Sequence, residues 1–311
     1  MSKFASFVVG SEGQDGRILF DALAAQGRKP LGIGRRRTRC ESPWRRKPVD
    51  IRSAAQVCAL VREFKPAEIY YLAAFNHSST ARLPKEAVLF RRSHEVHVAG
   101  LVNFLEAIRR FSPATRLFYA ASAHVFGRPK TRMQDEKTPI RPVSIYGITK
   151  AAGLEACRSY RRRHGVFAAV GILYNHAQGP GFAARKIVRG VADIQRGRCK
   201  KLVLGNLDAR IDWGYAPDYV EAMQAILRHR TAQDFIVASG KARSVRQFVR
   251  TAFSRAGLDC RAFVKEDRRL LTREQATLVG NPRKLKRLTG WRPRVSFEQM
   301  IEILLKAEGV S

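Results

Sequence analysis

Residues 7–16 read FVVGSEGQDG, and this stretch decides the fold. Three apolar residues lead directly into glycines at positions 10, 13 and 16, the pattern of a first strand, a tight turn and the start of a helix. Glycines let such a turn adopt backbone angles closed to other residues and let the backbone approach a pyrophosphate. The free N–H groups at the start of the helix suit the same phosphates. The stretch predicts dinucleotide binding, although a glycine-rich turn can also simply link a strand to a helix.

Strand-like and helix-like runs alternate through the first half of the chain. They predict strands at 4–9, 30–34, 69–73, 115–121 and 167–173, and helices at 17–26, 54–64, 96–111 and 146–164. Such repetition is typical of a parallel sheet with helices on both faces. We therefore expect an α/β protein with a Rossmann-type, doubly wound parallel sheet.

The alternation loosens after about residue 174. The later patterns predict a strand at 201–204 and helices at 184–195, 282–288 and 297–306. We expect residues 1–174 to form the dinucleotide-binding domain, with some later segments returning to it. Residues 175–311 would mainly form a smaller substrate-binding lobe over the carboxyl ends of the strands, where ligands bind in open α/β sheets.

The charge of the chain is extreme. Its 58 Lys and Arg residues against 26 Asp and Glu residues give a net charge of +32. Such a surface attracts polyanions, including nucleic acid and anionic membranes. No nucleic-acid motif and no interleaved aromatic residues accompany the basic clusters. We therefore favour an arginine-rich, solvated surface around a site for anionic ligands, and we do not expect nucleic acid as the primary partner.

The remaining composition indicates a cytoplasmic protein. The five cysteines are scattered and form no C-x-x-C pair, which favours a reducing compartment over a disulfide framework or a metal site. No run of about 18 apolar residues occurs, so no membrane span is expected. The first ten residues read as a core strand rather than as a signal peptide.

A second motif carries chemistry. The segment SIYGITK, residues 144–150, places Tyr146 and Lys150 four residues apart, on one face of a helix. A free tyrosine titrates near ~10, and a lysine cation nearby would lower that pKa and favour the phenolate. The pair therefore predicts a proton-transfer device. Ser122, at the end of a predicted strand in AASAHVFG (120–127), would hydrogen-bond the reacting oxygen of a sugar substrate.

With these motifs the chain resembles the extended short-chain dehydrogenase/reductases and, among them, the GDP-mannose 4,6-dehydratase family. The resemblance covers nearly the whole chain. It rests on the segments GQDG (13–16), GIGRR (32–36), EIYYLAA (68–74), YGITK (146–150), GILYNH (171–176), LGNLDA (204–209), DWGYAPDYVEAM (212–223) and GWRPRVSF (290–297). The glycine and Y-x-x-x-K motifs are shared across the superfamily, whereas N-H, R-K-I, LGNLDA and DWG are specific to the dehydratase branch.

The resemblance implies an enzyme with a nicotinamide cofactor, NADP rather than NAD. It places Gly10, Gly13, Gln14, Asp15 and Gly16 at the pyrophosphate, Arg35 and Arg36 at the ribose 2′-phosphate, Asp50 and Ile51 at the adenine, Leu72, Ala73 and Ala74 at the ribose and pyrophosphate, and Tyr146, Lys150 and His176 at the nicotinamide half. The arginines agree with this cofactor, because an acidic residue after the second strand would prefer a free ribose hydroxyl.

The resemblance also implies a nucleotide-sugar substrate, GDP-linked. Its contacts would come from Asn175, Lys186, Gly205, Asn206 and Arg210. Oxidation at carbon 4 of the sugar would use Ser122, Tyr146 and Lys150. His124 stands where the family has a glutamate that removes the proton from carbon 5.

Other departures weaken the match. Ile211 and Leu271 occupy positions where the family has arginines for the diphosphate, which Arg210 or nearby basic residues would have to replace. The segment between Arg36 and Asp50 is shorter than the family's tetramer-forming segment, which favours a homodimer, with a tetramer as the alternative.

Three interpretations remain open from the sequence. Histidine is a competent acid–base group near neutral pH, so His124 would support a rewired dehydration. If elimination is lost, the same groups support a 4-keto-sugar reductase, a dehydrogenase or an epimerase. The third interpretation is a non-catalytic relative that binds the cofactor or a polyanion.

Overall fold

The computed structural model of the chain describes residues 5–35, 38–39, 48–75, 84–176, 179, 182–271 and 276–310. Its main element is a seven-stranded sheet in the order β3-β2-β1-β4-β5-β6-β9. The strands are β1 (Ser6–Val9), β2 (Pro30–Ile33), β3 (Thr38–Arg39), β4 (Glu68–Tyr71), β5 (Arg116–Ser122), β6 (Ala168–Leu173) and β9 (Asp234–Val237). Neighbouring strands run parallel except at the edge, where β3 pairs antiparallel with β2. The predicted doubly wound parallel sheet is confirmed.

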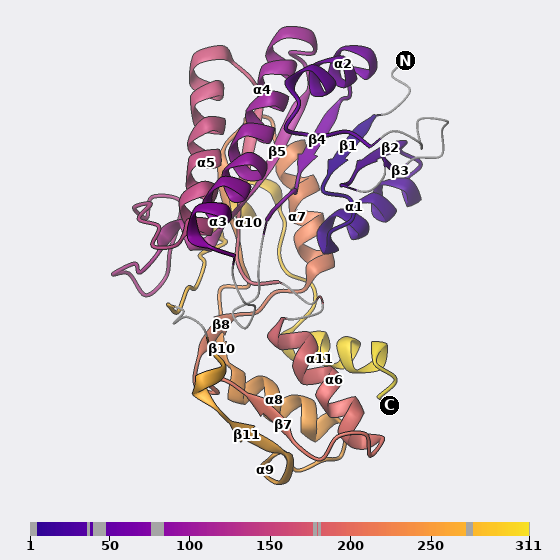
Figure 1. Cartoon of the computed structure of the whole chain (residues 1–311), viewed down its shortest axis with the longest axis vertical. Coiled ribbons are helices and arrows are strands. Elements are labelled where there is room, and N and C mark those ends of the chain that lie inside the picture. Colours follow the sequence, from indigo (N-terminus) through magenta and orange to yellow (C-terminus); the bar gives the residue numbers. More distant parts are fainter. Residues whose placement is uncertain are drawn as a thin grey trace.

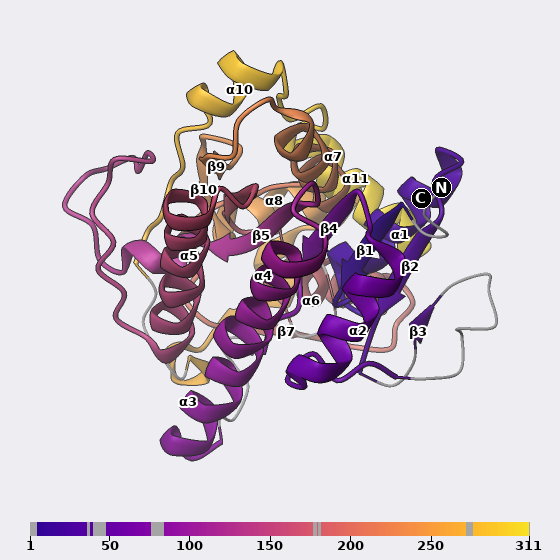
Figure 2. The same cartoon turned by 90° about the horizontal axis from the view of Figure 1, so that it is seen from above.

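Helices cover both faces of this sheet (Figures 1 and 2). One layer contains α2 (Ala54–Phe64), α4 (Gly100–Phe111) and α5 (Ile145–His164), and the other contains α1 (Gln14–Ala25), α7 (Ala216–Arg228) and α10 (Arg283–Thr289). Alternate residues of β1 enter the two layers. Phe7 and Val9 pack in the core with α2 and α4, and Val8 packs in the core with α1 and α7. This alternation follows from the two-residue period of a strand. Because both faces of β1 are covered, Phe7, Val8 and Val9 are all apolar.

Several helices are absent from the prediction, and one of them precedes the predicted helix 96–111. The helix expected at 96–111 is preceded by α3 (Glu86–His94), and a π-helical turn, Glu95–Ala99, joins α3 to α4. Ser93 is the single buried residue of α3, so this helix has no apolar stripe that the sequence could reveal. A π turn inside a helix often marks a functional position.

The second half of the chain builds a lobe with its own core, beneath the sheet in Figure 1. Its elements are α6 (Ala183–Gln195), β7 (Leu202–Leu204), β8 (Arg210–Asp212), β10 (Ala242–Ser244), α8 (Val245–Arg255), α9 (Cys260–Phe263), β11 (Val264–Glu266) and α11 (Phe297–Ala307). Helices α8 and α11 both begin with a capping box, at Ser244 and Ser296, which satisfies backbone donors at the helix start.

Later segments also return to the main sheet. Strand β9 pairs with β6, and α7 and α10 cover one face of the sheet. The strand order changes direction at β1, whose neighbours are β2 and β4, and ligands bind at such switch points outside the carboxyl ends of the strands. Among the residues that the structure describes, no helix has both the length and the apolar content needed to cross a bilayer.

Candidate active site

The glycine-rich turn lies at the switch point, between β1 and α1. Gly10 has a φ of +92°, and a Cβ atom there would lie 2.7 Å from the backbone nitrogen of Ala73. A Cβ atom on Gly16 would lie 2.2 Å from the carbonyl oxygen of Gly10. Only glycine fits at either position, because the clashing atoms belong to backbone. The turn and the loop after β4 are therefore packed directly against each other.

The start of α1 is suited to phosphate. Gly13 is its N-cap residue and is exposed, and no side chain caps the helix. The first N–H groups of a helix have no partner within the helix, and together with the helix dipole they attract anions. The residues at this turn therefore fit the pyrophosphate of a dinucleotide.

The other residues predicted at the cofactor follow the ends of β2 and β4 or precede α2. Leu72, Ala73 and Ala74 continue β4, and the amide of Leu72 donates to the carbonyl of Val9 at 2.9 Å. Arg35 is exposed after β2, and Arg36 lies outside the described residues.

Asp50 and Ile51 precede α2, and both are held by neighbouring side chains. Asp50 pairs with Arg52 at 2.8 Å, and the hydrogen bonds from Arg52 lower the pKa of the Asp50 carboxyl. The carbonyl of Ile51 accepts from the side chain of Asn103 at 2.9 Å.

Ser122 ends β5, and a 3-10 turn, Ala123–Phe126, follows it. The Ser122 hydroxyl oxygen accepts from the backbone N–H of His124 at 3.3 Å. Ser122 is buried, whereas the side chain of His124 is exposed. The rings of His124 and Tyr146 meet edge to face, with centroids 5.8 Å apart. The structure thus brings three of the four predicted catalytic residues together.

Lys150 completes this group from α5, which begins after its N-cap residue Ser144. The Lys150 side chain is buried, and its Nζ atom donates to the carbonyl of Ala120 at 2.7 Å. Nζ lies 5.9 Å from the centroid of the Tyr146 ring. The predicted helical spacing therefore places the amine and the phenol on the same side of α5.

The expected acidity of Tyr146 is wrong for this structure. Burial raises the pKa of Tyr146 to about 12, although the hydrogen bond with Ser122 opposes this shift. Burial also lowers the pKa of Lys150 to about 7, because a buried ammonium loses its hydration. The sequence shows that a lysine is near, but it does not show that Lys150 is buried and Tyr146 partly buried.

Asp15 and His176 form an ion pair between α1 and the loop after β6. Asp15 Oδ2 lies 2.8 Å from His176 Nε2, and His176 Nδ1 lies 2.7 Å from the carbonyl of Tyr174. Both ring nitrogens thus face oxygen acceptors. Burial alone would lower the pKa of His176, but the charge and hydrogen bond of Asp15 raise it. The same pairing keeps the pKa of Asp15 low although burial opposes ionisation.

Two functional candidates were missed by sequence reasoning. Tyr219, on α7, stacks on the His176 ring with centroids 4.4 Å apart. His97, on the π turn, meets the Tyr146 ring edge to face at 5.3 Å. Each lies far along the chain from its partner and at an apolar position of a helix, so no local pattern marks it.

The predicted substrate contacts lie in the loop after β6 and in the lower lobe. Asn175 follows β6, and its carbonyl accepts from Gly214 at 2.8 Å. Lys186 is exposed near the start of α6. Figure 1 shows β8 and β10 between the sheet and the rest of the lobe, and Arg210 on β8 donates to the carbonyl of Ala242 at 3.1 Å.

Gly205 and Asn206 follow β7. Gly205 faces Leu271, since a Cβ atom there would lie 2.8 Å from the leucine side chain. Asn206 Oδ1 accepts from the N–H of Asp208 at 2.9 Å, which forms a local turn. The role of these residues toward a substrate stays a prediction.

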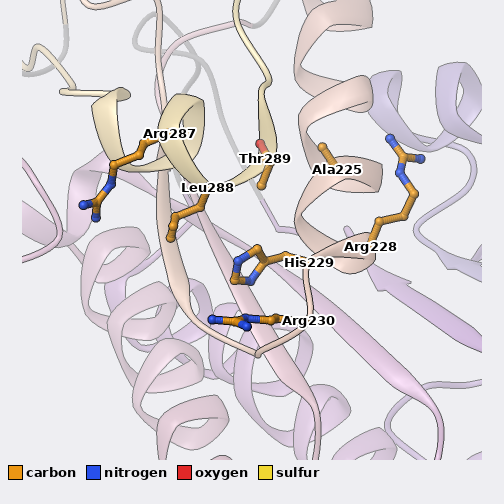
Figure 3. Close-up of a pocket in the computed structure, with 7 residues that line it drawn as sticks. All are labelled: Ala225, Arg228, His229, Arg230, Arg287, Leu288 and Thr289. Carbon is orange, nitrogen blue, oxygen red and sulfur yellow. The ribbon is translucent and has the colours of Figure 1, made fainter.

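A separate basic cavity of about 530 Å³ lies at the end of α7 (Figure 3). Its walls are Ala225, Arg228, His229, Arg230, Arg287, Leu288 and Thr289. None of the predicted site residues lines it. Figure 3 shows the side chains of Arg228 and Arg287 pointing in opposite directions, so they do not converge on one small anion.

Known proteins match the chain over nearly its whole length. A sequence profile of the family described as GDP-mannose 4,6 dehydratase matches residues 7–304. The chain is 31% identical to GDP-mannose 4,6 dehydratase 2 of Caenorhabditis elegans, over 97% of this chain and 88% of the relative. It is 30% identical to GDP-mannose 4,6-dehydratase of Vibrio cholerae, over 96% and 92%.

Solved structures share the fold. RMD of Pseudomonas aeruginosa, complexed with NADPH, superposes with a TM-score of 0.80 at 20% identity, over 98% of both chains. UDP-glucose 4-epimerase of Thermus thermophilus, in complex with NAD, gives a TM-score of 0.78 at 23% identity, over 98% of both chains. The resemblance seen in the motifs is therefore confirmed along nearly the whole chain, which belongs to the GDP-mannose 4,6-dehydratase family.

Proposed function

We propose that this enzyme uses a nicotinamide cofactor to carry out redox chemistry at carbon 4 of a GDP-linked sugar. One observation carries the proposal. Ser122, Tyr146 and Lys150 meet at the carboxyl end of β5, and the glycine turn follows the carboxyl end of β1 at the same edge of the sheet. The names of the relatives from Caenorhabditis elegans and Vibrio cholerae support the substrate class.

The residues at the switch point fit the cofactor. The uncapped start of α1 would receive the pyrophosphate, and Leu72, Ala73 and Ala74 would border it. We infer NADP rather than NAD, because Arg35 and Arg36 follow β2 where a 2′-phosphate would need cations. When bound, the nicotinamide would accept or donate the hydride.

In the first candidate reaction, a dehydration, Tyr146 takes the proton of the sugar's 4-hydroxyl while Ser122 holds that oxygen. His124 then takes the proton from carbon 5 and gives it to the hydroxyl that leaves carbon 6 as water. The hydride removed from carbon 4 would return to carbon 6, and the proton that Tyr146 received would pass through solvent to carbon 5, which gives the 4-keto-6-deoxy sugar. The exposed imidazole lies beside the Tyr146 ring, which supports this role. Histidine changes charge near neutral pH and suits both proton transfers.

The second candidate is a 4-keto-sugar reductase, and the pKa of Tyr146 favours it. A phenol whose pKa is about 12 is neutral at pH 7, so it is ready to give a proton rather than to take one. In this direction Tyr146 donates its proton to the sugar's O4 while the carbonyl carbon is reduced. Ser122 again holds the oxygen.

The two candidates differ in their products. Incubation with GDP-mannose and NADP⁺ would release a 4-keto-6-deoxy sugar nucleotide if the enzyme dehydrates, which mass spectrometry detects as the loss of one water. Incubation of a 4-keto GDP-sugar with NADPH would consume the cofactor's absorbance if the enzyme reduces. If neither reaction proceeds, the proposed substrate class is wrong.

Variants assign the steps. We expect Tyr146→Phe to lower kcat by about 100-fold or more in either reaction, because it removes the proton-transferring oxygen. Tyr160→Phe is the matched control, since Tyr160 lies on the same helix and its hydroxyl bonds Glu106 instead. His124→Ala should abolish dehydration and leave reduction, and His124→Glu should keep or raise dehydration.

We further propose that residues 175–311, apart from the segments that return to the main sheet, mainly serve the substrate. In this arrangement Asn175, Lys186, Gly205, Asn206 and Arg210 contact the nucleotide-sugar. Arg210→Gln should raise KM for the GDP-sugar without changing the dissociation constant of the cofactor, since Arg210 belongs to β8 and not to the switch point.

A further inference from the structure

The π turn before α4 is fixed to the sheet by two tyrosines. The Tyr71 hydroxyl of β4 donates to the carbonyl of Val96 at 2.5 Å, and the Tyr119 hydroxyl of β5 lies 3.4 Å from the carbonyl of His97. The side chain of His97 is fully buried. The turn thus holds the imidazole at one place in the interior, beside the carboxyl ends of β4 and β5.

The imidazole joins two segments that the proposed function uses. His97 Nε2 accepts from the backbone N–H of Phe75 at 2.9 Å, in the loop that follows β4. His97 Nδ1 lies 2.8 Å from the hydroxyl oxygen of Thr149, on α5. Thr149 in turn bonds the carbonyls of Ile145 and Tyr146, at 2.9 and 3.2 Å. One ring therefore connects the predicted cofactor loop with the helical turn that carries Tyr146.

These partners fix the tautomer of His97. A backbone amide can only donate, so Nε2 carries no hydrogen and Nδ1 carries it. The Thr149 hydroxyl must then accept from Nδ1 and give its own hydrogen to the helix carbonyls. Burial, with a smaller contribution from the charge of Lys150, lowers the pKa of His97 to about 2, so the ring stays neutral in any assay.

We infer that His97 is a positioning residue, which sets the distance between the cofactor loop after β4 and the Tyr146 side chain. This inference rests on the proposed function. The two hydrogen-bond partners of His97 lie 22 and 52 residues away from it in the sequence. Contacts within a single helix or loop therefore cannot make the same connection. The edge-to-face contact with the Tyr146 ring, at 5.3 Å, transmits any shift of His97 directly to the phenol.

The test compares His97→Leu, His97→Gln and a matched control. Leucine removes both bonds, whereas glutamine offers an acceptor and a donor in the same side chain. Thr115→Val is the control, because Thr115 is also buried and bonds Pro66 and Ser112 at the opposite, amino edge of the sheet. Each variant is titrated with NADP⁺ to give the dissociation constant without turnover, and kcat and the melting temperature are then measured.

We expect His97→Leu to weaken NADP⁺ binding and to lower kcat by about 10- to 100-fold, as misplacement of reacting groups does. His97→Gln should restore most of both losses, and Thr115→Val should lower only the melting temperature. If His97→Leu does not fold, Thr149→Val carries the test, because it removes the acceptor of Nδ1 and leaves the ring in place.

A spectroscopic measurement is independent of activity. Nitrogen-15 NMR of the histidine side chains should show one ring in the Nδ1–H form that does not titrate between pH 5 and 9. The inference is overturned if that signal is missing, or if His97→Leu and Thr115→Val bind NADP⁺ equally well. If the wild-type protein binds no nicotinamide cofactor, the proposed function fails as well.

Discussion

At the scale of single residues, burial opposes the charges that the chemistry needs. The pKa of Lys150 is about 7 in the folded protein, against an ordinary value of 10.5. Between these two pH values the unfolded chain binds more protons than the folded one, so stability rises with pH across that window. Below pH 7 the Lys150 ammonium is charged in both the folded and the unfolded state. The free energy of unfolding is then lowered by the full cost of burying that charge.

The rise of stability with pH leads to a prediction for the variant Lys150→Met. We expect the variant to melt a few degrees above the wild type at pH 6, because an unpaired buried charge is replaced by an apolar side chain of similar length. The difference should shrink as the pH rises from about 7 towards 10. Calorimetry at several pH values measures it. A gap that widens with pH would contradict the buried-ammonium explanation.

Tyr219 gives a second prediction at this scale. Its hydroxyl is buried and has no hydrogen-bond partner among the described residues, while its ring stacks on His176. Tyr219→Phe should leave stability unchanged or raise it by up to about 1 kcal/mol, because an unsatisfied polar group is removed. Tyr219→Leu should lose the stacking and weaken NADP⁺ binding. Chemical denaturation and cofactor titration distinguish the two, and a large loss in the phenylalanine variant would reveal an unseen partner of the hydroxyl.

At the scale of elements, the approach of α5 to the π turn depends on one glycine. A Cβ atom on Gly153 would lie 2.3 Å from the Tyr119 hydroxyl and 2.8 Å from the carbonyl of His97. Helix α5 carries Tyr146 and Lys150, so its distance from β5 determines where the catalytic groups stand. Through this packing, Gly153 affects the position of the catalytic groups although it has no side chain.

Gly153→Ala should therefore push α5 away and lower both stability and kcat. Overpacking of this kind costs about 1–3 kcal/mol. The double variant Gly153→Ala with Tyr119→Phe should recover part of the loss, since the nearest clashing atom is the phenolic oxygen. Ala152→Ser, at an exposed neighbouring position, serves as the control. Thermal melts and turnover assays measure the effect, and purely additive variants would contradict the steric explanation.

At the scale of the whole molecule, the net charge of +32 dominates. Repulsion among like charges destabilises a compact state, and salt screens it over about 8 Å at physiological ionic strength. None of the described carboxylates forms an ion pair with Arg228, Arg230 or Arg287 at the basic cavity (Figure 3). The repulsion among these three cations is therefore not offset by an ion pair.

We expect the melting temperature to rise as NaCl increases from 20 to 300 mM. Replacing Arg228, Arg230 and Arg287 with glutamine should raise stability at low salt and flatten the salt dependence. Replacement of Arg158, Arg161 and Arg198, which pair with carboxylates, should instead lower stability at low salt. Thermal melts measure both sets. A melting temperature that falls with salt in the wild type would show that ion pairs outweigh repulsion.

An element of the fold could be predicted where its apolar residues and its capping residue form a pattern within the element itself. The helix 54–64 appears with its predicted bounds, because its apolar residues repeat on one face and Ser53 caps its start. Helix α3 was not predicted because it buries almost nothing. Strand β9 was not predicted either, although all four of its residues are buried, because a short apolar run is ambiguous between strand and helix.

The candidate site divides in the same way. Tyr146 and Lys150 share one helix, so their common face follows from the helical repeat. The Asp15–His176 pair joins residues 161 positions apart, and only the folded chain shows that they form an ion pair. His97 and Tyr219 gave no signal, since a histidine or tyrosine at an apolar helical position resembles an ordinary core residue.

By itself the sequence determined the parallel sheet, the glycine turn and the Tyr-Lys spacing, because each depends on neighbours a few residues away. Only the tertiary structure decided what surrounds these groups: the buried His97 beside Tyr146, the pairing of Asp15 with His176, and the depth at which Lys150 lies. Charge states depend on that depth. A pKa reflects the loss of water from all sides, and that loss is a property of the whole fold.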